Sequence, residues 1–463
     1  MKKKVLIILL VVFGLLLAGA IGFGIYLNTN FSTMIFEKGL DKLYTLSNST
    51  LTKANMFDYE NKIVEINNNI SYTSSNEIKQ LIGLDTVSLN YNLTLDNKNR
   101  KMLNNISYLE GNKEYLNVDL LYNSSDYSYI NLNNLFTKIL KVSLDEETTK
   151  SMEEMFDTIL DNGKTIKDTD RLIYLVVEIV KNNLNKNDII KQDVTVTIDG
   201  KEQKLTEYCY NLEGEKLNNF IINILTEMEK NQEIINILKD TYKMEEVNLV
   251  QYYKDNYEYS NTDKLLASIY VSGKYNIVGF SITENTEVNN TTIKYIGVND
   301  SYIFEVNDDP DLVGIIEGSK DESGTINLVI KENEEEIGTL KITEENNEYT
   351  FIIDNIDNTM SITIKYKTEK INDNENNLNI EVGIVSEGIS LGIIKFNQNA
   401  RIVDKLEEFD YSNAVDVNDL TEEDQNELIT NMQEQLGDSV LYNLLIASSY
   451  DSQINDIIYS NMY

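Results

Sequence analysis

The chain contains no histidine and only one cysteine among its 463 residues. Without histidine, Ser-His-Asp and Cys-His catalysis, histidine general bases and nearly all zinc and copper sites are excluded. Cys209 lies in the strand-like segment Tyr208–Tyr210, and we expect it to be a small buried hydrophobe without a catalytic role. One cysteine cannot form an intramolecular disulfide, so apolar burial must stabilise the fold. We predict no enzyme activity, no cofactor and no metal site.

Acidic residues outnumber basic residues by 76 to 40, and the formal net charge is −36. A surface of this charge repels nucleic acid and anionic lipid headgroups, so nucleic acid is excluded as a partner. Hydrophobic residues make up 41% of the chain, and tyrosine occurs 29 times. This composition is too apolar for a disordered acidic tail, and we expect a folded protein with a large core.

The longest apolar segment is the N-terminal run from Val5 to Leu27, which directly follows Lys2, Lys3 and Lys4. At about 1.5 Å per helical residue, this run is long enough to cross a hydrocarbon core of about 30 Å. Positive charges favour the cytoplasmic side of a membrane helix. The pattern predicts a single-pass anchor in the cell membrane, with a cytoplasmic N-terminus and the bulk of the chain outside the cytoplasm.

A cleaved signal peptide is the alternative, because Ala18–Ala20 has the small-x-small pattern of a signal peptidase site. The apolar run continues beyond this site to Leu27, where a signal peptide normally becomes polar, and this favours the anchor. The stretch Leu17–Ala20 is also similar to a lipoprotein box, but alanine stands where the acylated cysteine belongs. Without a thiol there is no group for a lipid to modify.

Alternating apolar and polar residues predict two β-meanders. Val87–Leu95 begins the first meander and is predicted to be a strand with one buried and one solvent-exposed face. The second meander extends from about Leu265 to Ile402, where the chain is again almost entirely strand and turn. Between the meanders, Met152–Leu160 and Lys216–Leu238 have apolar residues at helical spacing.

Three local signals refine this assignment. Leu172–Val180 is apolar on almost every side, so a helix there must be covered by other elements. Asp199-Gly200 separates two strand-like runs and predicts a tight hairpin turn. Thr421 and Asp424 have the spacing of a capping box, which predicts a helix at Leu420–Leu436.

Together these patterns predict an α+β fold: an N-terminal transmembrane helix followed by a large curved antiparallel β-sheet, with helices packed on its concave face. The expected segments are a cytoplasmic stub and anchor, a short joint, a helix, meander and helix half of the ectodomain, a second meander half, and a C-terminal helical segment. They correspond to residues 1–27, 28–34, 35–250, 251–410 and 411–463.

The order of these elements resembles the bacterial lipoprotein carriers of the LolA and LppX type. Two stretches, Val194–Thr206 with its following helix and Asp410–Asp424, are similar to a family of uncharacterised membrane-anchored proteins of Gram-positive bacteria. The resemblance implies a curved sheet whose concave face is plugged by helices. That family has no known catalytic residues, so the resemblance implies none for this chain.

Two acidic clusters, Asn307–Asp311 and Asp373–Asn377, are the remaining candidates for chemistry. Their oxygens are of the kind that binds calcium, but neither cluster has the glycine at position six and the glutamate at position twelve of an EF-hand loop. Both lie between predicted strands, and we interpret them as solvated turns.

Two functions of different classes fit this sequence. A binding module would hold a lipid or another apolar ligand between the sheet and its helices, whereas a cell-surface interaction or envelope-structural protein would have a groove filled by its own helices and an envelope protein as partner. The free volume beneath the sheet distinguishes them, because ligand sites typically enclose about 300 to 1,000 Å³. A carboxylate-dependent hydrolase is a third alternative.

Overall fold

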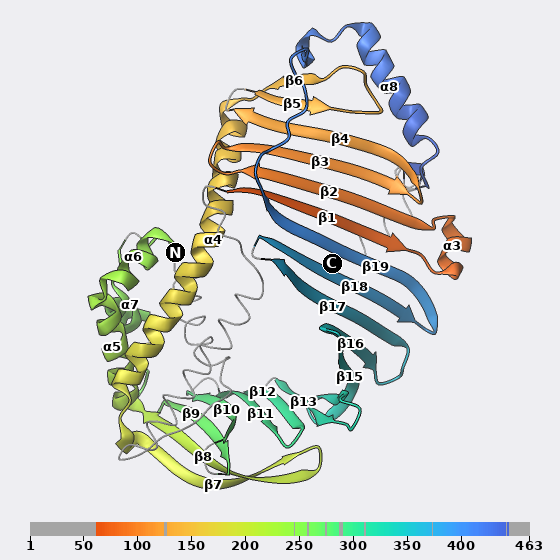
Figure 1. Cartoon of the computed structure of the whole chain (residues 1–463). Helices are drawn as coiled ribbons and strands as arrows, with labels where there is room; N and C mark the ends of the chain where they lie inside the picture. The colour runs from red at the N-terminus through yellow and green to blue at the C-terminus, as the bar shows by residue number, and fades with distance from the viewer. Residues whose placement is uncertain are drawn as a thin grey trace. The chain divides into compact units, whose positions relative to one another are not determined.

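The computed structural model describes residues 62–443, except residues 125–126, 245, 257–258, 274–275, 287–289, 310–311, 373 and 441. The chain divides into two compact units. Among the described residues, unit 1 comprises residues 161–343, and unit 2 comprises residues 62–160 and 344–443. Each unit contains its own row of hydrogen-bonded strands (Figure 1).

Unit 2 is built on a row of antiparallel strands in the spatial order β6-β5-β4-β3-β2-β1-β19-β18-β17-β16. A short strand, β20, pairs in parallel with β6. The elements of unit 2 are β1 (Ile63–Thr73), α3 (Asn76–Ile82), β2 (Thr86–Asp96), β3 (Lys101–Glu110), β4 (Lys113–Ser124), β5 (Tyr127–Asn131), β6 (Leu140–Ser143), β16 (Glu348–Asn355), β17 (Met360–Asn372), β18 (Glu375–Ser386), β19 (Ile389–Val403), β20 (Val415–Asp416), η2 (Val417–Asp419) and α8 (Glu422–Leu436).

Strand β1 joins the two halves of this sheet. It pairs with β2 on one side and with β19 on the other, so Ile63 lies opposite both Asp96 and Val403. The pairing places the first described strand between residues that are more than 300 positions apart in sequence. The predicted first meander is confirmed as β2 to β5, and the predicted capping box is confirmed by reciprocal hydrogen bonds between Thr421 and Asp424 at the start of α8.

Unit 1 combines helices with a second row of antiparallel strands. Helix α4 begins in unit 2 and ends in unit 1, and as one helix of 38 residues it includes both Met152–Leu160 and Leu172–Val180, which the sequence pattern predicts as separate stretches. The remaining elements are η1 (Lys186–Asp188), β7 (Ile189–Ile198), β8 (Lys201–Glu213), α5 (Gly214–Lys230), α6 (Gln232–Asp240), α7 (Leu249–Asn256), β9 (Lys264–Ser272), β10 (Asn276–Asn285), β11 (Asn290–Val298), β12 (Ser301–Asp309), β13 (Leu312–Lys320), β14 (Ile326–Glu332) and β15 (Glu335–Glu345), with α4 spanning Glu146–Asn183.

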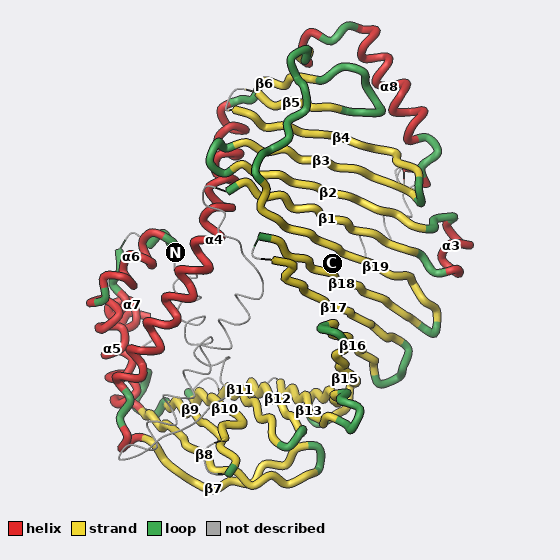
Figure 2. The backbone as a smooth tube through the Cα atoms, viewed as in Figure 1, coloured by secondary structure: helices red, strands yellow, loops and turns green. Residues whose placement is uncertain are grey.

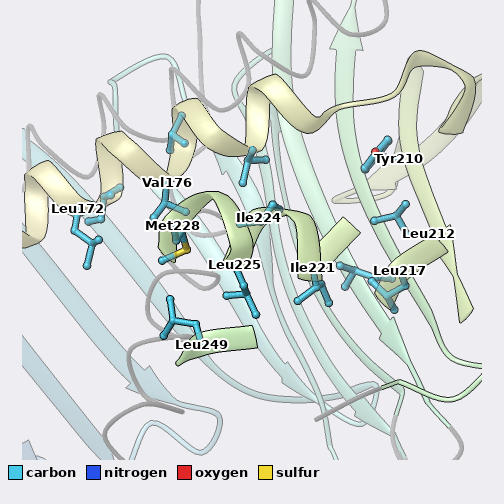
Figure 3. Close-up of a cluster of buried hydrophobic side chains, with 14 of the residues drawn as sticks. Leu172, Val176, Tyr210, Leu212, Leu217, Ile221, Ile224, Leu225, Met228 and Leu249 are labelled. Carbon is cyan, nitrogen blue, oxygen red and sulfur yellow. The ribbon is translucent and has the colours of Figure 1, made fainter. Parts of the chain in front are cut away.

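The main core of unit 1 lies between its helices and strands β7 to β10. Figure 3 shows Leu172 and Val176 of α4 directed toward Met228 of α5. Val176 is 1% exposed, and the other apolar residues of the same core include Leu225 and Leu249. The prediction that Leu172–Val180 is covered is therefore confirmed. The helices, and not the sheet alone, provide the cover.

Asparagine ends one helix and begins the next within this core. The predicted single helix over Lys216–Leu238 is two helices, because Asn231 is extended and separates α5 from α6. Its side chain accepts hydrogen bonds from the backbone N–H groups of Glu233 and Ile234. These are the N–H groups that a helix start leaves without an internal partner.

The opposite side of β7 to β10 is covered by the sheet itself. Ile198, Leu205 and Ile296 form a second buried cluster, against which Ile315 of β13 packs. The predicted Asp199-Gly200 turn is confirmed, and both residues have positive φ. The Asp199 backbone N–H donates to the Glu317 carboxylate, with N and Oε2 3.1 Å apart. The hairpin tip is thus tied to β13.

The predicted fold class is wrong in its balance of helix and sheet. The protein is mainly β-sheet. Among the described residues, helices α4 to α7 cover the part formed by β7 to β10, and in unit 2 the first part of α4 covers only one end of the sheet, at Phe156. In unit 2, α3 and α8 lie beside strand ends (Figure 2). The reason is the connectivity: among the described residues, no helix lies between consecutive strands from β10 to β19, so this stretch provides no helix to cover the sheet.

The prediction of a transmembrane helix, and with it the prediction of a signal anchor, must also be corrected. Across the described part of the chain, no helix is long and apolar enough to span a membrane. Helix α4 is long, but charged residues occur along most of it. The residues that carried the prediction, Lys2, Lys3, Lys4, Val5 and Leu27, lie outside the described residues.

Candidate functional site

The pleat of the unit 2 sheet separates two kinds of side chain. On β1, Val64, Ile66, Ile70 and Tyr72 alternate with polar residues, so the two sets point to opposite sides of the sheet. The register of the neighbouring strands continues this separation across the sheet. We call the two sides the apolar face and the polar face of unit 2.

Asparagines form two transverse rows on the polar face. Row 1 runs from β18 to β4 through Asn379, Asn397, Asn69, Asn90, Ser107 and Asn117. Row 2 runs from β18 to β5 through Asn377, Asn399, Asn67, Asn92, Asn105, Asp119 and Asn131. Because neighbouring strands are about 4.8 Å apart, row 2 is about 29 Å long. Asparagine is normally depleted in strands, so its alignment over adjacent strands is a specific feature of this sheet.

Many neighbouring side chains within the rows are hydrogen-bonded to one another. In row 1, the Asn69 Nδ2 donates to Asn90 Oδ1 at 2.7 Å, and the Asn90 Nδ2 donates to Ser107 Oγ at 3.0 Å. In row 2, the Asn105 Nδ2 donates to Asp119 Oδ1 at 2.7 Å and to Asn117 Oδ1 of row 1 at 2.9 Å. The bonds hold the amide groups side by side across the strands.

Several charged side chains on the polar face form ion pairs beside the rows. The Arg401 guanidinium lies 2.7 Å from the Glu65 carboxylate. The Glu381 carboxylate lies between Lys365 and Lys395, at 2.9 and 3.0 Å. Hydrogen bonds from these two ammonium groups, Lys365 first, hold the pKa of Glu381 below its usual range. The rows themselves are neutral except for Asp119.

The segment between β19 and β20, residues 404–414, crosses the polar face at one side of the rows (Figure 1). The Tyr411 ring lies against the Tyr129 ring, with centroids 4.3 Å apart, and the Glu408 carboxylate accepts from the Lys101 ammonium at 2.6 Å. The rows are left accessible: Asn397 is exposed, and the other asparagines of both rows are half-exposed.

The apolar face is nearly free of charge. Lys370 is the one charged side chain among the described residues that point to this face from six adjacent strands. These strands are β2, β1, β19, β18, β17 and β16. Seven large apolar side chains on these strands are each 36% to 44% exposed: Ile70, Leu89, Tyr349, Ile353, Met360, Tyr366 and Ile394. The first part of α4 covers one end of the face, where Phe156 packs against Leu95 and Tyr122.

Neither predicted acidic cluster forms a site in the described structure. Asn307, Asp308 and Asp309 belong to strand β12 and not to a turn, and the residues that follow lie outside the described set. In the second cluster, Asp373 is likewise outside it, and Asn377 belongs to row 2. Within the described ranges, no group of three or more histidine, cysteine, aspartate or glutamate residues is arranged to hold a metal ion.

Cys209 lies on β8 and is buried, as predicted. Burial raises the pKa of its thiol. A buried neutral thiol is a weak nucleophile, because the thiolate is the reactive form.

The space expected between sheet and helices is filled by side chains of the unit 1 core. A depression of about 260 Å³ lies elsewhere, over the β7–β8 hairpin and β9, and its lining includes Asp193, Lys204, Leu205 and Val271. It is open and mixed in polarity. The apolar face of unit 2, which the sequence did not predict, brings together seven exposed large apolar side chains.

Comparisons with known proteins do not assign a family. No protein-family model matches the chain, and no curated protein matches it. One similar solved structure is described as "The Structure of Intact Ap-TbpB (N and C lobes)", with 10% identity, 74% of this chain and 78% of that chain covered, and a TM-score of 0.13. A likeness of this size carries no argument about fold or function. The resemblance to LolA-type carriers and to a Gram-positive family stays a prediction.

Proposed function

We propose that the protein is a non-catalytic binding protein that takes an apolar, uncharged lipid on the apolar face of unit 2. The observation that supports this proposal is the combination of seven half-exposed large apolar side chains with a single lysine over six adjacent strands. Exposed apolar surface of this extent normally marks an interaction site. The location differs from the cleft expected between sheet and helices.

The near absence of charge on the apolar face favours a lipid with a neutral headgroup. Lys370 lies at one edge of it, so an anionic headgroup would find almost no cationic partner there. The net charge of −36 adds a general repulsion of anions. Acyl chains with a neutral headgroup meet neither obstacle, because their transfer from water onto apolar side chains is favourable by about 25 cal/mol per Å².

A second candidate is an interaction or envelope-structural protein. The observation that favours it is the close filling of the unit 1 core by its own helices. In that case the apolar face of unit 2 would dock a protein, including a second copy of this chain. A location outside the cytoplasm and contact with a membrane, expected from the N-terminal lysines and apolar run, stay predictions.

The proposal predicts that Ile70→Ser with Ile394→Ser weakens lipid binding by at least about tenfold. Each side chain is about two-fifths exposed, and loss of its contact with an acyl chain costs about 1 kcal/mol. The measurement is cosedimentation of the full-length protein with phosphatidylcholine vesicles that contain dioleoylglycerol, compared with vesicles without it.

The control variant carries Ile190→Ser and Ile293→Ser, two isoleucines of similar exposure on unit 1. It should bind as the wild type does, and both variants should melt near the wild-type temperature. Absence of dioleoylglycerol binding by the wild type, or equal loss in both variants, would refute the proposal. A wild-type dimer that only the Ile70 and Ile394 variant dissociates would establish the second candidate instead.

A further inference from the structure

We propose that the polar face of unit 2 binds a neutral polysaccharide chain along rows 1 and 2. This inference goes beyond the lipid-binding proposal and rests on the opposite side of the same sheet. The observation that supports it is the alignment of eleven asparagines over adjacent strands. The strand register gives the position of each asparagine in row 1 or row 2. The ligand would lie across the strands, parallel to the rows.

The hydrogen bonds within the rows leave capacity for a ligand. A carboxamide has two N–H donors and an oxygen with two lone pairs. Asn69 uses one N–H toward Asn90 and one lone pair toward Asn397. Asn90 accepts from Asn69 and donates one N–H to Ser107. Each of these groups keeps one donor and one acceptor, which is what a sugar hydroxyl requires of its partner.

The bonds within the rows also prepare the surface for binding. Neighbouring amides fix one another, so a ligand does not have to order freely rotating side chains, and less conformational entropy is lost on binding. In row 1 the amide donors of Asn397, Asn69 and Asn90 all point the same way along the row. Aligned hydrogen bonds strengthen one another in a chain of this kind.

The charge of the polar face favours a neutral glycan over a polyanion. Of the cations beside the rows, Arg401, Lys365 and Lys395 are held by Glu65 and Glu381, and Lys367 lies opposite Asn379 at the β17 end of row 1. Asp119 is the one charged member of the rows. Along the rows an anionic polymer would therefore meet a carboxylate, and a cation only at the β17 end, whereas hydroxyl groups are matched by the amides throughout.

The dimensions suit a polymer. Row 2 crosses seven strands from β18 to β5, a length of about 29 Å at the usual strand spacing. A single sugar would use a small part of this row. The affinity should therefore increase with chain length, because each added sugar meets a further strand, and β18, β19, β1 and β2 each present a pair of amides.

The experiment measures binding of cellohexaose and chitohexaose, two neutral hexasaccharides, to the full-length protein by isothermal titration calorimetry. Each should bind more tightly than its disaccharide, with an affinity that hardly changes with salt. The variant Asn69→Ala, Asn90→Ala, Asn397→Ala should bind at least tenfold more weakly. A hyaluronate hexasaccharide serves as the anionic comparison and should bind more weakly than either neutral glycan.

The matched control is Asn68→Ala with Gln398→Ala. These residues lie next to row 1 on the same strands but belong to the opposite face, where the Gln398 Nε2 donates to Asn68 Oδ1 at 2.8 Å. This variant should keep wild-type glycan affinity, and both variants should show the melting temperature of a folded protein. The inference fails if the wild type binds neither neutral glycan, if hyaluronate binds best, or if the control loses as much affinity as the row variant. Dioleoylglycerol binding is unaffected by any of these results, so the two proposals can fail separately.

Discussion

Val176→Asp is expected to unfold unit 1. Val176 is 1% exposed in the core that joins α4 to the other helices, and an aspartate there would be buried without a partner. Burial of an unpaired carboxylate costs several kcal/mol, a large fraction of the stability of a typical domain. Thermal melting followed by circular dichroism, together with urea titration, measures the effect.

The control for this prediction is Glu178→Asp on the same helix. Glu178 is partly exposed and lies 2.7 Å from the Lys181 ammonium, and exposed pairs of this kind contribute little. Its melting temperature should stay near that of the wild type. Identical melting of Val176→Asp and wild type would mean that this face of α4 is exposed, and the helical core described above would be wrong.

Phe156→Ala is expected to remove most of the contact between α4 and the unit 2 sheet. The Phe156 side chain is fully buried, and its ring centroid lies 5.8 Å from that of Tyr122. Truncation of a buried phenylalanine to alanine costs about 3 to 5 kcal/mol through lost transfer free energy and the cavity left behind. Urea denaturation monitored by tyrosine fluorescence gives the free energy of unfolding.

Ile429→Ala on α8 is the matched control for Phe156→Ala. Ile429 is 53% exposed, so its truncation should change the free energy of unfolding by no more than about 0.5 kcal/mol. If the two variants were equally stable, Phe156 would not be a buried contact. The assignment of the first part of α4 to unit 2 would then lose its support.

Local patterns predict local structure well in this chain. The alternation of Val87–Leu95 becomes β2, the Asp199-Gly200 turn closes the β7–β8 hairpin, and Thr421 caps α8. Each of these features depends on residues within one element or one turn. The burial of Leu172–Val180 was predictable for the same reason, because a helix that is apolar on almost every side must be covered by other elements.

Long-range pairing was not predictable in the same way. Strand β1 has polar Asn68 in the middle of its apolar side, which interrupts the alternation. Its partner β19 is more than 300 residues away, and no local signal specifies that register. That the described helices cover only one end of the unit 2 sheet follows from the same long-range connectivity.

The asparagine rows show why the candidate sites were missed. Asparagine is abundant throughout the sequence, so a strand asparagine such as Asn69 or Asn399 carries no signal by itself. The rows exist only when the register aligns residues of seven strands. The apolar face is similar, since each strand contributes a few apolar residues of the kind that any half-buried strand contains.

Thiol labelling of Ile394→Cys tests most directly whether unit 2 presents an accessible apolar face that binds lipid. The one native thiol, Cys209, is buried, so a maleimide reports the new cysteine in the full-length protein. We predict rapid labelling of Ile394→Cys that dioleoylglycerol vesicles slow, and rapid labelling of Asn397→Cys on the polar face that the same vesicles leave unchanged. Labelling of Ile394→Cys as slow as that of Cys209, or an equal effect of the vesicles on both variants, would contradict the account.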